Sequence, residues 1–354
     1  MKKNISPIKS RLIWNTVLCV LLLVSLLVIA PAPVAHAASF VVINTGDSGA
    51  GSLRQAITDA MLTLEPDTIT FSVSGTITLA STLPDIASGG GALTIDGAGQ
   101  TITISGPGAS CTTCFSVFYV DPGATLTLNN LTVTNGYNGF CVYSGATLTL
   151  NNLMVTNGNG GSGGGIYNQY GAITITNSTF SGNSASGYGG GIYNLGGTVT
   201  IINSTFSGNS AYSGGGGITN DGGTLTITNS NFSGNSTSGF GGGIFNNSGT
   251  LTITNSNFSG NSTSGFNGGG IYNNSIVTIT NSTFSGNSAS ASGGGGGGIY
   301  SSSGTLNVAN STFSVNSGAN GGGIYNSGTA TITNSTFYGN SDGGHGGGGG
   351  GISN

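Results

Sequence analysis

GGGIYNLGGTVTIINSTFSGNSA, residues 189–211, is the stretch that decides the fold, because slightly altered copies of it fill the second half of the chain. The isoleucine after each glycine run recurs every 25 to 28 residues. A phenylalanine recurs in register with it, and an asparagine follows three residues later, from Asn183 to Asn340. A fixed period in this range is typical of a solenoid. The two series are Ile166, Ile192, Ile218, Ile244, Ile271, Ile299, Ile324 and Ile352, and Phe180, Phe206, Phe232, Phe258, Phe284, Phe313 and Phe337.

Within one unit, residues 198–201 (TVTI) alternate polar and apolar side chains, which is the pattern of a strand with one buried face. Each unit holds three strand candidates, Gly-Ile-Tyr, Thr-Val-Thr-Ile and Ser-Thr-Phe, separated by Gly, Asn and Ser. We therefore predict an all-β fold, a right-handed parallel β-helix with one unit per coil. Ile192, Val199 and Phe206 should point inward and stack on their equivalents about 4.8 Å away.

One asparagine of each unit is expected in a turn, where its left-handed geometry is tolerated and its amide can form a ladder between coils. These asparagines are Asn203, Asn229, Asn255, Asn281, Asn310 and Asn334.

The chain divides into four predicted parts. Residues 1–37 are a signal peptide, because a basic start precedes an apolar run at 17–30 and a small-residue cleavage site ending at Ala37. Residues 38–66 form an N-terminal cap, residues 67–162 form irregular coils, and residues 163–354 form the regular repeats. About twelve coils result.

The cap should contain an amphipathic helix that plugs the first coil, because a solenoid end exposes both core and strand edges. Ser52 and Gln55 suggest a capping box, and Pro66 should stop the helix. At the other end, residues 351–354 open a further unit. There we expect a continuation in a longer chain, or an open coil available for end-to-end self-association. The helically spaced apolar residues are Leu53, Ala56, Ile57, Ala60, Met61 and Leu64.

Beyond residue 37, Arg54 is the only basic residue against nine acidic residues. Nucleic acid is therefore excluded as a partner, because nothing neutralises phosphates. Anionic lipid surfaces are disfavoured for the same reason.

The repeats resemble a known family. Gly-Gly-Gly-Ile followed by Phe-Ser-Gly-Asn, in register over residues 163–354, resembles the paired GGA/GI and FxxN repeats of the polymorphic outer membrane proteins, β-helical surface proteins of the chlamydiae. Residues 51–57 (GSLRQAI) resemble the SLR-x-AI head of bacterial right-handed β-helix proteins, which share the pectin-lyase-like fold. The resemblance implies an exported rod, secreted or at the cell surface or outer membrane, and adhesion to glycans or to proteins of host or neighbouring cells.

An enzymatic function is an alternative, because this fold class includes polysaccharide lyases and hydrolases. Hydrolases need two carboxyl groups about 5 to 9.5 Å apart. After residue 123 the only acids are Asp221 and Asp342, which the isoleucine register places four coils apart. Asp96 and Asp121 are the best remaining pair, on adjacent coils if residues 101–104 align with 125–128. Asp before Gly or Pro-Gly is also what a turn requires, and we favour that interpretation.

The cysteines and the single histidine beyond residue 37 offer no complete metal site. Cys111 and Cys114 could bind metal, act as a redox pair or form a short loop disulfide, and the disulfide suits an exported chain. Cys141 is expected to be a buried thiol beside Tyr119, and His345 a solvated loop residue. We expect no catalytic residues, no metal and no cofactor.

Two surface arrays remain. Threonines on adjacent coils would form outward ladders like those of ice-binding solenoids, although threonine also suits any solvated β-face. Tyrosines at one coil position suit carbohydrate or protein contact. The predicted function is non-enzymatic, adhesive or structural, with a polysaccharide lyase or hydrolase and an ice-binding solenoid as alternatives. The arrays are Thr224, Thr226, Thr228, Thr250, Thr252 and Thr254, and Tyr167, Tyr193, Tyr272, Tyr300 and Tyr325.

Overall fold

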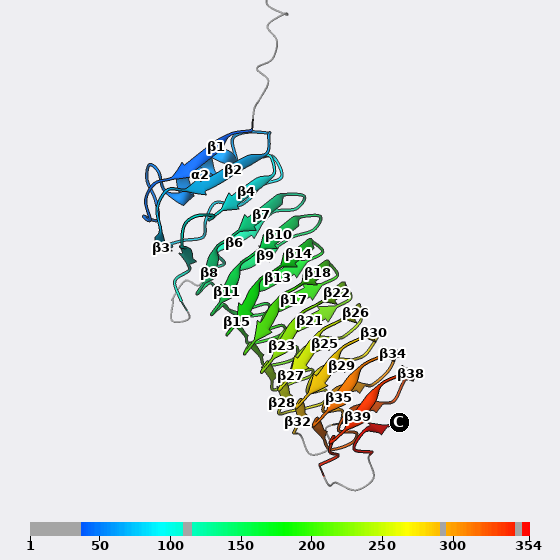
Figure 1. Cartoon of the computed structure of the whole chain (residues 1–354). Helices are drawn as coiled ribbons and strands as arrows, with labels where there is room; N and C mark the ends of the chain where they lie inside the picture. The colour runs from blue at the N-terminus through cyan, green and yellow to red at the C-terminus, as the bar shows by residue number, and fades with distance from the viewer. Residues whose placement is uncertain (1–36, 109–114, 291–294, 344–348) are drawn as a thin grey trace, which may run out of the picture. The chain divides into compact units, whose positions relative to one another are not determined.

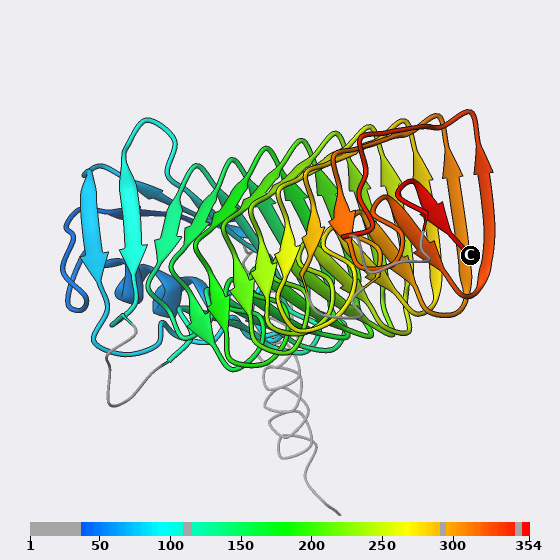
Figure 2. The ribbon, with the colours of Figure 1, turned by 90° about the horizontal axis from the view of Figure 1, so that it is seen from below.

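The computed structural model describes residues 37–108, 115–290, 295–343 and 349–354, so residues 1–36 of the predicted signal peptide, Cys111, Cys114 and His345 lie outside the described residues. From Ala37 on, the chain forms one unit. It is a parallel β-solenoid of about twelve coils, with one short helix at its N-terminal end (Figure 1). Figure 2 shows the coils stacked one on the next with their strands aligned.

Within the described ranges, successive coils build four parallel sheets, which we name after a characteristic residue or their length. The Tyr sheet comprises β6 (Phe118–Val120), β9 (Phe140–Val142), β13 (Ile166–Gln169), β17 (Ile192–Leu195), β21 (Ile218–Asp221), β25 (Ile244–Asn246), β29 (Ile271–Asn273), β33 (Ile299–Ser301), β37 (Ile324–Asn326) and β40 (Ile352–Ser353). The Thr sheet comprises β1 (Ser39–Val42), β2 (Asp67–Phe71), β4 (Leu93–Asp96), β7 (Thr125–Asn129), β10 (Thr147–Asn151), β14 (Ala172–Thr176), β18 (Thr198–Ile202), β22 (Thr224–Thr228), β26 (Thr250–Thr254), β30 (Ile276–Thr280), β34 (Thr305–Ala309) and β38 (Thr329–Thr333).

The Phe sheet and a short sheet complete the coil. The short sheet has two-residue strands that the sequence analysis did not predict, because Ser-Ala reads as part of a turn. The Phe sheet comprises β3 (Gly75–Thr78), β5 (Ile102–Ser105), β8 (Thr132–Thr134), β11 (Met154–Thr156), β15 (Thr179–Ser181), β19 (Thr205–Ser207), β23 (Asn231–Ser233), β27 (Asn257–Ser259), β31 (Thr283–Ser285), β35 (Thr312–Ser314) and β39 (Thr336–Tyr338). The short sheet comprises β12 (Asn159–Gly160), β16 (Ser184–Ala185), β20 (Ser210–Ala211), β24 (Ser236–Thr237), β28 (Ser262–Thr263), β32 (Ser288–Ala289) and β36 (Ser317–Gly318).

The predicted registers are confirmed. Ile166 pairs with Ile192, and the isoleucine series continues through every later coil to Ile352. The phenylalanine series pairs in the same way from Phe180 to Phe337. The offset of 22 upstream also holds, since Leu126 pairs with Leu148.

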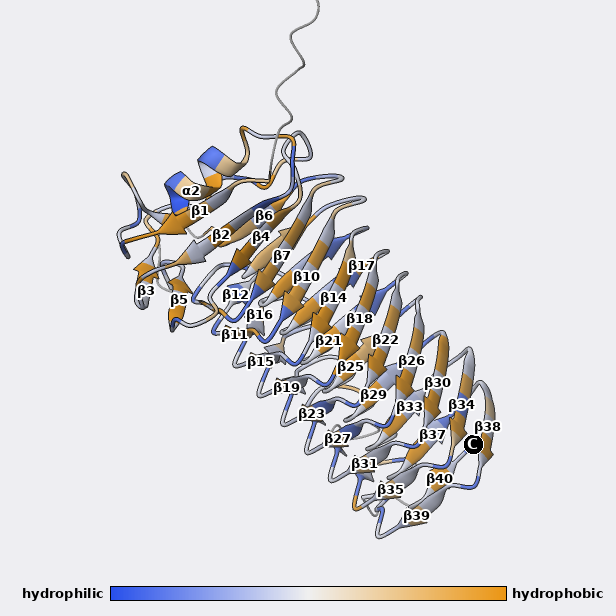
Figure 3. Ribbon diagram, turned by 45° about the horizontal axis from the view of Figure 1, so that its top comes forward, coloured by the Kyte–Doolittle hydropathy of each residue, from blue (hydrophilic) through white to orange (hydrophobic). Residues whose placement is uncertain are grey.

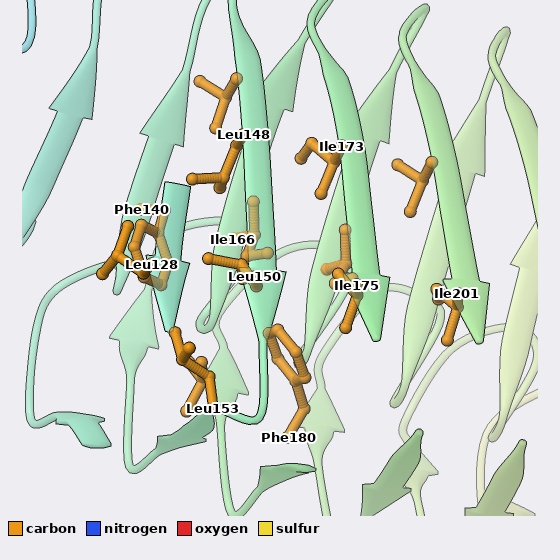
Figure 4. Packing of buried hydrophobic residues seen from close by; sticks show 14 of the residues in the cluster. Leu128, Phe140, Leu148, Leu150, Leu153, Ile166, Ile173, Ile175, Phe180 and Ile201 are labelled. Carbon is orange, nitrogen blue, oxygen red and sulfur yellow. The ribbon is translucent and has the colours of Figure 1, made fainter. Parts of the chain in front are cut away.

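The core is a set of stacked side-chain columns inside the solenoid. Hydrophobic residues recur at the same place on successive strands (Figure 3), and Figure 4 shows Leu150, Ile175 and Phe180 pointing into the interior. Successive Phe rings from Phe180 to Phe337 are nearly parallel, with centroids 4.7–4.9 Å apart. Each fully buried Phe or Ile contributes about 1.5–3 kcal/mol, so these columns stabilise the stack without ion pairs.

The glycine runs are required by the approach of one coil to the next. Gly189 has a φ of 65°, which favours glycine. A Cβ on Gly190 would lie 2.3 Å from the carbonyl oxygen of Ser210 and 2.4 Å from that of Gly216. Both contacts are with the backbone of the adjacent coil, which cannot move aside. The GGGI motif therefore marks the place where coil backbones touch.

Asparagine ladders are present, but the main ones are not where the sequence analysis placed them. The Asn203 series does adopt the predicted left-handed conformation, with φ between 47° and 52°. Its side chains lie largely in solvent, and Asn229 donates to Asn203 at 3.2 Å. The continuous ladder instead joins the asparagines that follow the phenylalanines: each side-chain amide donates to the next Oδ1 at 2.9–3.0 Å. A second buried ladder runs from Asn168 to Asn273.

The N-terminal helix α2 (Leu53–Ala60) packs on β1 and β2 as the predicted plug. Ser52 accepts from the backbone N–H of Gln55, so the N-cap is confirmed, but the Gln55 side chain donates to Asp59 and not back to Ser52. The helix ends well before Pro66, with Met61 as its C-cap, and Leu64 is exposed. The spacing of apolar residues up to Leu64 therefore predicted a helix about one turn longer than the one observed.

Arg54 explains the SLR motif at the cap. Its Nη2 forms an ion pair with Asp47 Oδ1 at 2.7 Å and donates to the Ser81 carbonyl at 2.8 Å. The only basic side chain beyond residue 37 is thus held by the cap itself, while Leu53 and Ile57 beside it are fully buried.

Replacing both Leu53 and Ile57 with Asp should lower the melting temperature by about 10 °C or more, because two carboxylates would enter the apolar end of the core. Leu62→Asp is the control, since Leu62 is 80% exposed, and its shift should stay within about 2 °C. Thermal unfolding followed by circular dichroism measures both, and an unchanged double variant would show that the helix does not close the coil.

Gly190→Ala should destabilise the chain by about 2–3 kcal/mol, because its Cβ meets backbone of the adjacent coil. Gly208 has a φ of 61° and nothing near its would-be Cβ, so Gly208→Ala should cost only about 1 kcal/mol of backbone strain. Urea unfolding of both variants separates steric contact from strain. Equal losses would contradict the close-approach explanation.

Candidate functional site

The predicted tyrosine row lies on the outer face of the Tyr sheet. In β13, β17 and β29 the isoleucine is buried, the tyrosine after it faces outward and the asparagine that follows is buried again. Tyr167 pairs with Tyr193, and Tyr272 pairs with Tyr300, which pairs with Tyr325. The row is therefore confirmed as an outward column with partly exposed rings.

Thr219 and Phe245 occupy the two positions between Tyr193 and Tyr272. The Thr219 hydroxyl is buried and donates to the Gly214 carbonyl at 2.9 Å. The outward column therefore has no ring at the Thr219 position. Tyr188, from the loop before β17, lies between the rings of Tyr193 and Phe245 and joins them. Its ring centroid lies 6.0 Å from that of Tyr193 and 6.2 Å from that of Phe245.

Two further loop residues widen the array. Phe240 lies 4.6 Å from Phe266 and 4.8 Å from Tyr272, ring centroid to ring centroid. Phe266 is 51% exposed although it is large and apolar. The result is an unbroken series of nine rings in contact, which we call the aromatic strip: Tyr167, Tyr193, Tyr188, Phe245, Phe240, Phe266, Tyr272, Tyr300 and Tyr325.

The repeat pattern predicted only the five strand tyrosines of the strip, and Phe245, which takes the tyrosine position of its own strand, was missed. Tyr188, Phe240 and Phe266 stand in the loops just before the glycine runs, outside the strand pattern. Aromatic residues at one loop position of three units, residues 188, 240 and 266, were the signal that could have found them.

Asp221 is part of this surface. The Tyr193 hydroxyl donates to its Oδ2 at 3.2 Å, and Asn247 donates to its Oδ1 at 2.9 Å. Burial and the Asp221 charge together raise the pKa of Tyr193 far above its ordinary value. Tyr193 is therefore a neutral hydrogen-bonding group at any physiological pH.

Cys141 lies where the column continues upstream. It pairs with Tyr119 on one side and Tyr167 on the other, and it is 6% exposed, so the predicted buried thiol beside Tyr119 is confirmed. Burial raises its pKa to about 11, while a hydrogen bond with Ser116 partly offsets the shift. A thiol with this pKa is not a nucleophile near neutral pH.

Asp96 and Asp121 are not adjacent equivalents, so the alternative of a carboxylate pair is wrong, and the favoured turn interpretation fits Asp96. Asp96 pairs with Asn129, because β4 aligns with β7, whereas residues 102–105 belong to the Phe sheet. Asp96 accepts from the Ala98 N–H at 2.9 Å and from Asn130 at 2.8 Å, as a turn residue does.

The coil register brings Asp121 close to Asp85 instead. Ile86 pairs with Val120, and burial and the Asp121 charge raise the pKa of Asp85. The approach of Asp85 to Asp121 could not be predicted from the repeat pattern, because Asp85 lies in an irregular loop. A hollow of about 540 Å³ lies elsewhere, beside Gly97, Asn130 and Met154, and no titratable side chain lines it.

The threonine ladders of β22 and β26 pair as predicted, with Thr224 opposite Thr250, Thr226 opposite Thr252 and Thr228 opposite Thr254. The grid does not continue evenly. Ile202 and Ile276 take threonine positions in the neighbouring coils on either side.

Among the described residues, no three His, Cys, Asp or Glu side chains gather as metal ligands would. In the same part of the chain, no helix has the length and apolar character to cross a membrane.

Two family models match the chain. Residues 116–272 match the right-handed β-helix region, and residues 281–302 match the Chlamydia polymorphic membrane protein repeat. Both resemblances drawn from the sequence are confirmed, and the repeat points to a surface protein. No curated protein sequence matches the chain.

Solved structures of pectin-lyase-like β-helices are similar in fold. A polygalacturonase from Erwinia carotovora ssp. carotovora is 12% identical, with 88% of this chain and 96% of that chain covered and a TM-score of 0.47. The pectate lyase Pel9A is 14% identical, with 86% and 79% covered and a TM-score of 0.41. A galactohydrolase named for a sulfated galactose and anhydrogalactose substrate is 11% identical, with 87% and 89% covered and a TM-score of 0.36. Similarity this distant transfers neither activity nor substrate.

Alkylation of Cys141 in the folded chain should stay slow at pH 8 and rise only as the pH approaches its pKa of about 11. In the urea-unfolded chain the same cysteine should react readily at about pH 8–9. Iodoacetamide labelling with peptide mass spectrometry distinguishes Cys141 from the other cysteines. Equal rates in both states at pH 8 would contradict a buried, neutral thiol.

Proposed function

We propose that this chain, a right-handed β-helix carrying a polymorphic membrane protein repeat, is a non-catalytic adhesive protein exported to the cell surface by residues 1–37. The observation that carries the proposal is the aromatic strip. Nine rings in contact form a continuous aromatic surface, on which Tyr188 is 39% exposed and Phe266 is 51% exposed, and contiguous exposed apolar surface marks an interaction site. Aromatic rings with polar tips are the side chains that dominate binding surfaces.

The charge of the chain supports adhesion over the enzymatic alternative. Polygalacturonate is a polyanion, and a site for it needs basic side chains. No Lys or Arg follows residue 54, and Arg54 is already paired with Asp47. An uncharged partner fits this surface best.

The strip is tested by measuring adhesion of the secreted protein to immobilised glycans and to cell surfaces. Replacing Tyr272 and Tyr300 with Ala removes two adjacent stacked rings and should weaken binding by about tenfold or more. Tyr212→Ala is the matched control: Tyr212 is 69% exposed and follows the short sheet. It should leave binding unchanged.

Unchanged binding by the Tyr272→Ala, Tyr300→Ala variant would refute the role of the strip.

Product analysis of the bound glycans tests the hydrolase alternative, and it compares the unmodified protein with an Asp85→Asn, Asp121→Asn variant. Cleavage that this variant abolishes would establish the hydrolase alternative, and freezing-point hysteresis of the unmodified protein would establish the ice-binding alternative.

A further inference from the structure

A hollow lies at the upstream end of the aromatic strip, and its origin is a single small residue. In the outward column of the Tyr sheet, Cys141 stands between Tyr119 and Tyr167, one coil from each. A cysteine side chain is much shorter than a tyrosine side chain, so the outward column lacks a ring at the Cys141 position. A hollow of about 360 Å³ opens there, and we call it the tyrosine slot, with walls formed by Tyr119, Tyr137, Tyr143 and Tyr167.

The spacing of the slot walls suits one six-membered ring. Two strand spacings separate the Tyr119 and Tyr167 backbones, which is about 9.6 Å. Apolar atoms pack about 3.5–4.0 Å apart, so a saturated six-membered ring can contact an aromatic wall on either side. The Tyr119 and Tyr143 rings are stacked and nearly parallel, with centroids 6.3 Å apart. Tyr137 is 41% exposed and stands at the rim.

The floor of the slot is built and fixed. Ser116 and Asn138 are buried, and the Ser116 hydroxyl donates to Asn138 Oδ1 at 3.3 Å. The Asn138 amide donates to the Ser162 carbonyl at 2.8 Å. These hydrogen bonds fix the side chains of the floor and already engage their polar atoms. The groups that the slot offers to a ligand are therefore the ring faces and the phenolic hydroxyls of the tyrosines. Hydroxyl groups arranged around apolar faces are the complement of a sugar, whose own C–H faces are apolar and whose edge carries hydroxyls.

Charge defines which sugar. No charged side chain lines the slot. Burial is the main cause that raises the pKa of Tyr143, and the charge of Asp121 adds to it, so an acidic group acts on this wall of the slot. Asp85 lies beside Asp121, and no basic residue follows residue 54. A uronate, sulfated or phosphorylated sugar would be repelled.

We infer that the tyrosine slot binds one uncharged pyranose ring of a neutral glycan. This inference rests on the proposed adhesive function and supplies its ligand class. Tyr167 is both a wall of the slot and the first ring of the aromatic strip, so further sugar residues of the same glycan can pack along the strip. The slot binds a terminal or an internal sugar of the glycan, and the aromatic strip contacts the sugars next to it.

The test uses the secreted protein and a set of neutral oligosaccharides of glucose, galactose, mannose and N-acetylglucosamine, with trigalacturonate and choline as charged comparators. Isothermal titration calorimetry measures binding of the best neutral ligand. Cys141→Tyr fills the slot by restoring the missing ring and should raise Kd by about tenfold or more, as should Tyr119→Ala, which removes a wall. Cys141→Ser keeps the slot open and should bind as the unmodified protein does.

Circular dichroism establishes that each variant is folded. If Cys141→Tyr does not fold, Tyr119→Ala and Tyr143→Ala decide the question. An unchanged Kd in the folded wall variants overturns the slot, as does tighter binding of trigalacturonate or choline than of any neutral sugar.

The same assay with Tyr272→Ala, Tyr300→Ala separates the two proposals. If that variant loses adhesion while the slot variants keep it, the slot is wrong and the adhesive function stands. If the unmodified protein binds no glycan and adheres to no cell, both are wrong.

Discussion

The structure depends on one constraint: each coil must lie a single strand spacing, about 4.8 Å, from the next. At that spacing every side chain contacts its own equivalent. Identical charges would repel along the whole stack, whereas rings stack and amides bond in series. The near absence of charged residues after residue 123 follows directly, and so does the glycine run, since Gly190 leaves room for no Cβ.

Most of the fold could be predicted, because the constant coil spacing makes equivalent residues recur at a regular interval in the sequence. Ile192 and Phe206 recur in register, so their pairing and burial followed from the period alone. The N-cap at Ser52 was equally readable. The end of the helix was not, because Leu64 continues the helical spacing although the chain has already turned away at Met61.

The errors arose where similar residues meet different environments. Both asparagine series repeat perfectly, and nothing in the letters says that Asn209 is buried while Asn203 is exposed. Asp96 was misplaced because TITI at 101–104 resembles TLTL at 125–128, although one belongs to the Phe sheet and the other to the Thr sheet. The candidate site was half visible: its strand tyrosines are periodic, while the loop rings and the interruption at Cys141 depend on three-dimensional neighbours.

The buried Asn ladder has translational symmetry, and this makes the length of the solenoid adjustable. Asn209 meets Asn235 through the same bonds by which Asn235 meets Asn261. Since each coil contacts only its neighbours, a whole coil can be gained or lost without creating a new kind of interface. Near-identical repeats also invite unequal recombination. A lineage of such proteins can therefore vary the length of the solenoid, and with it the length of the aromatic strip, while the cap stays unchanged.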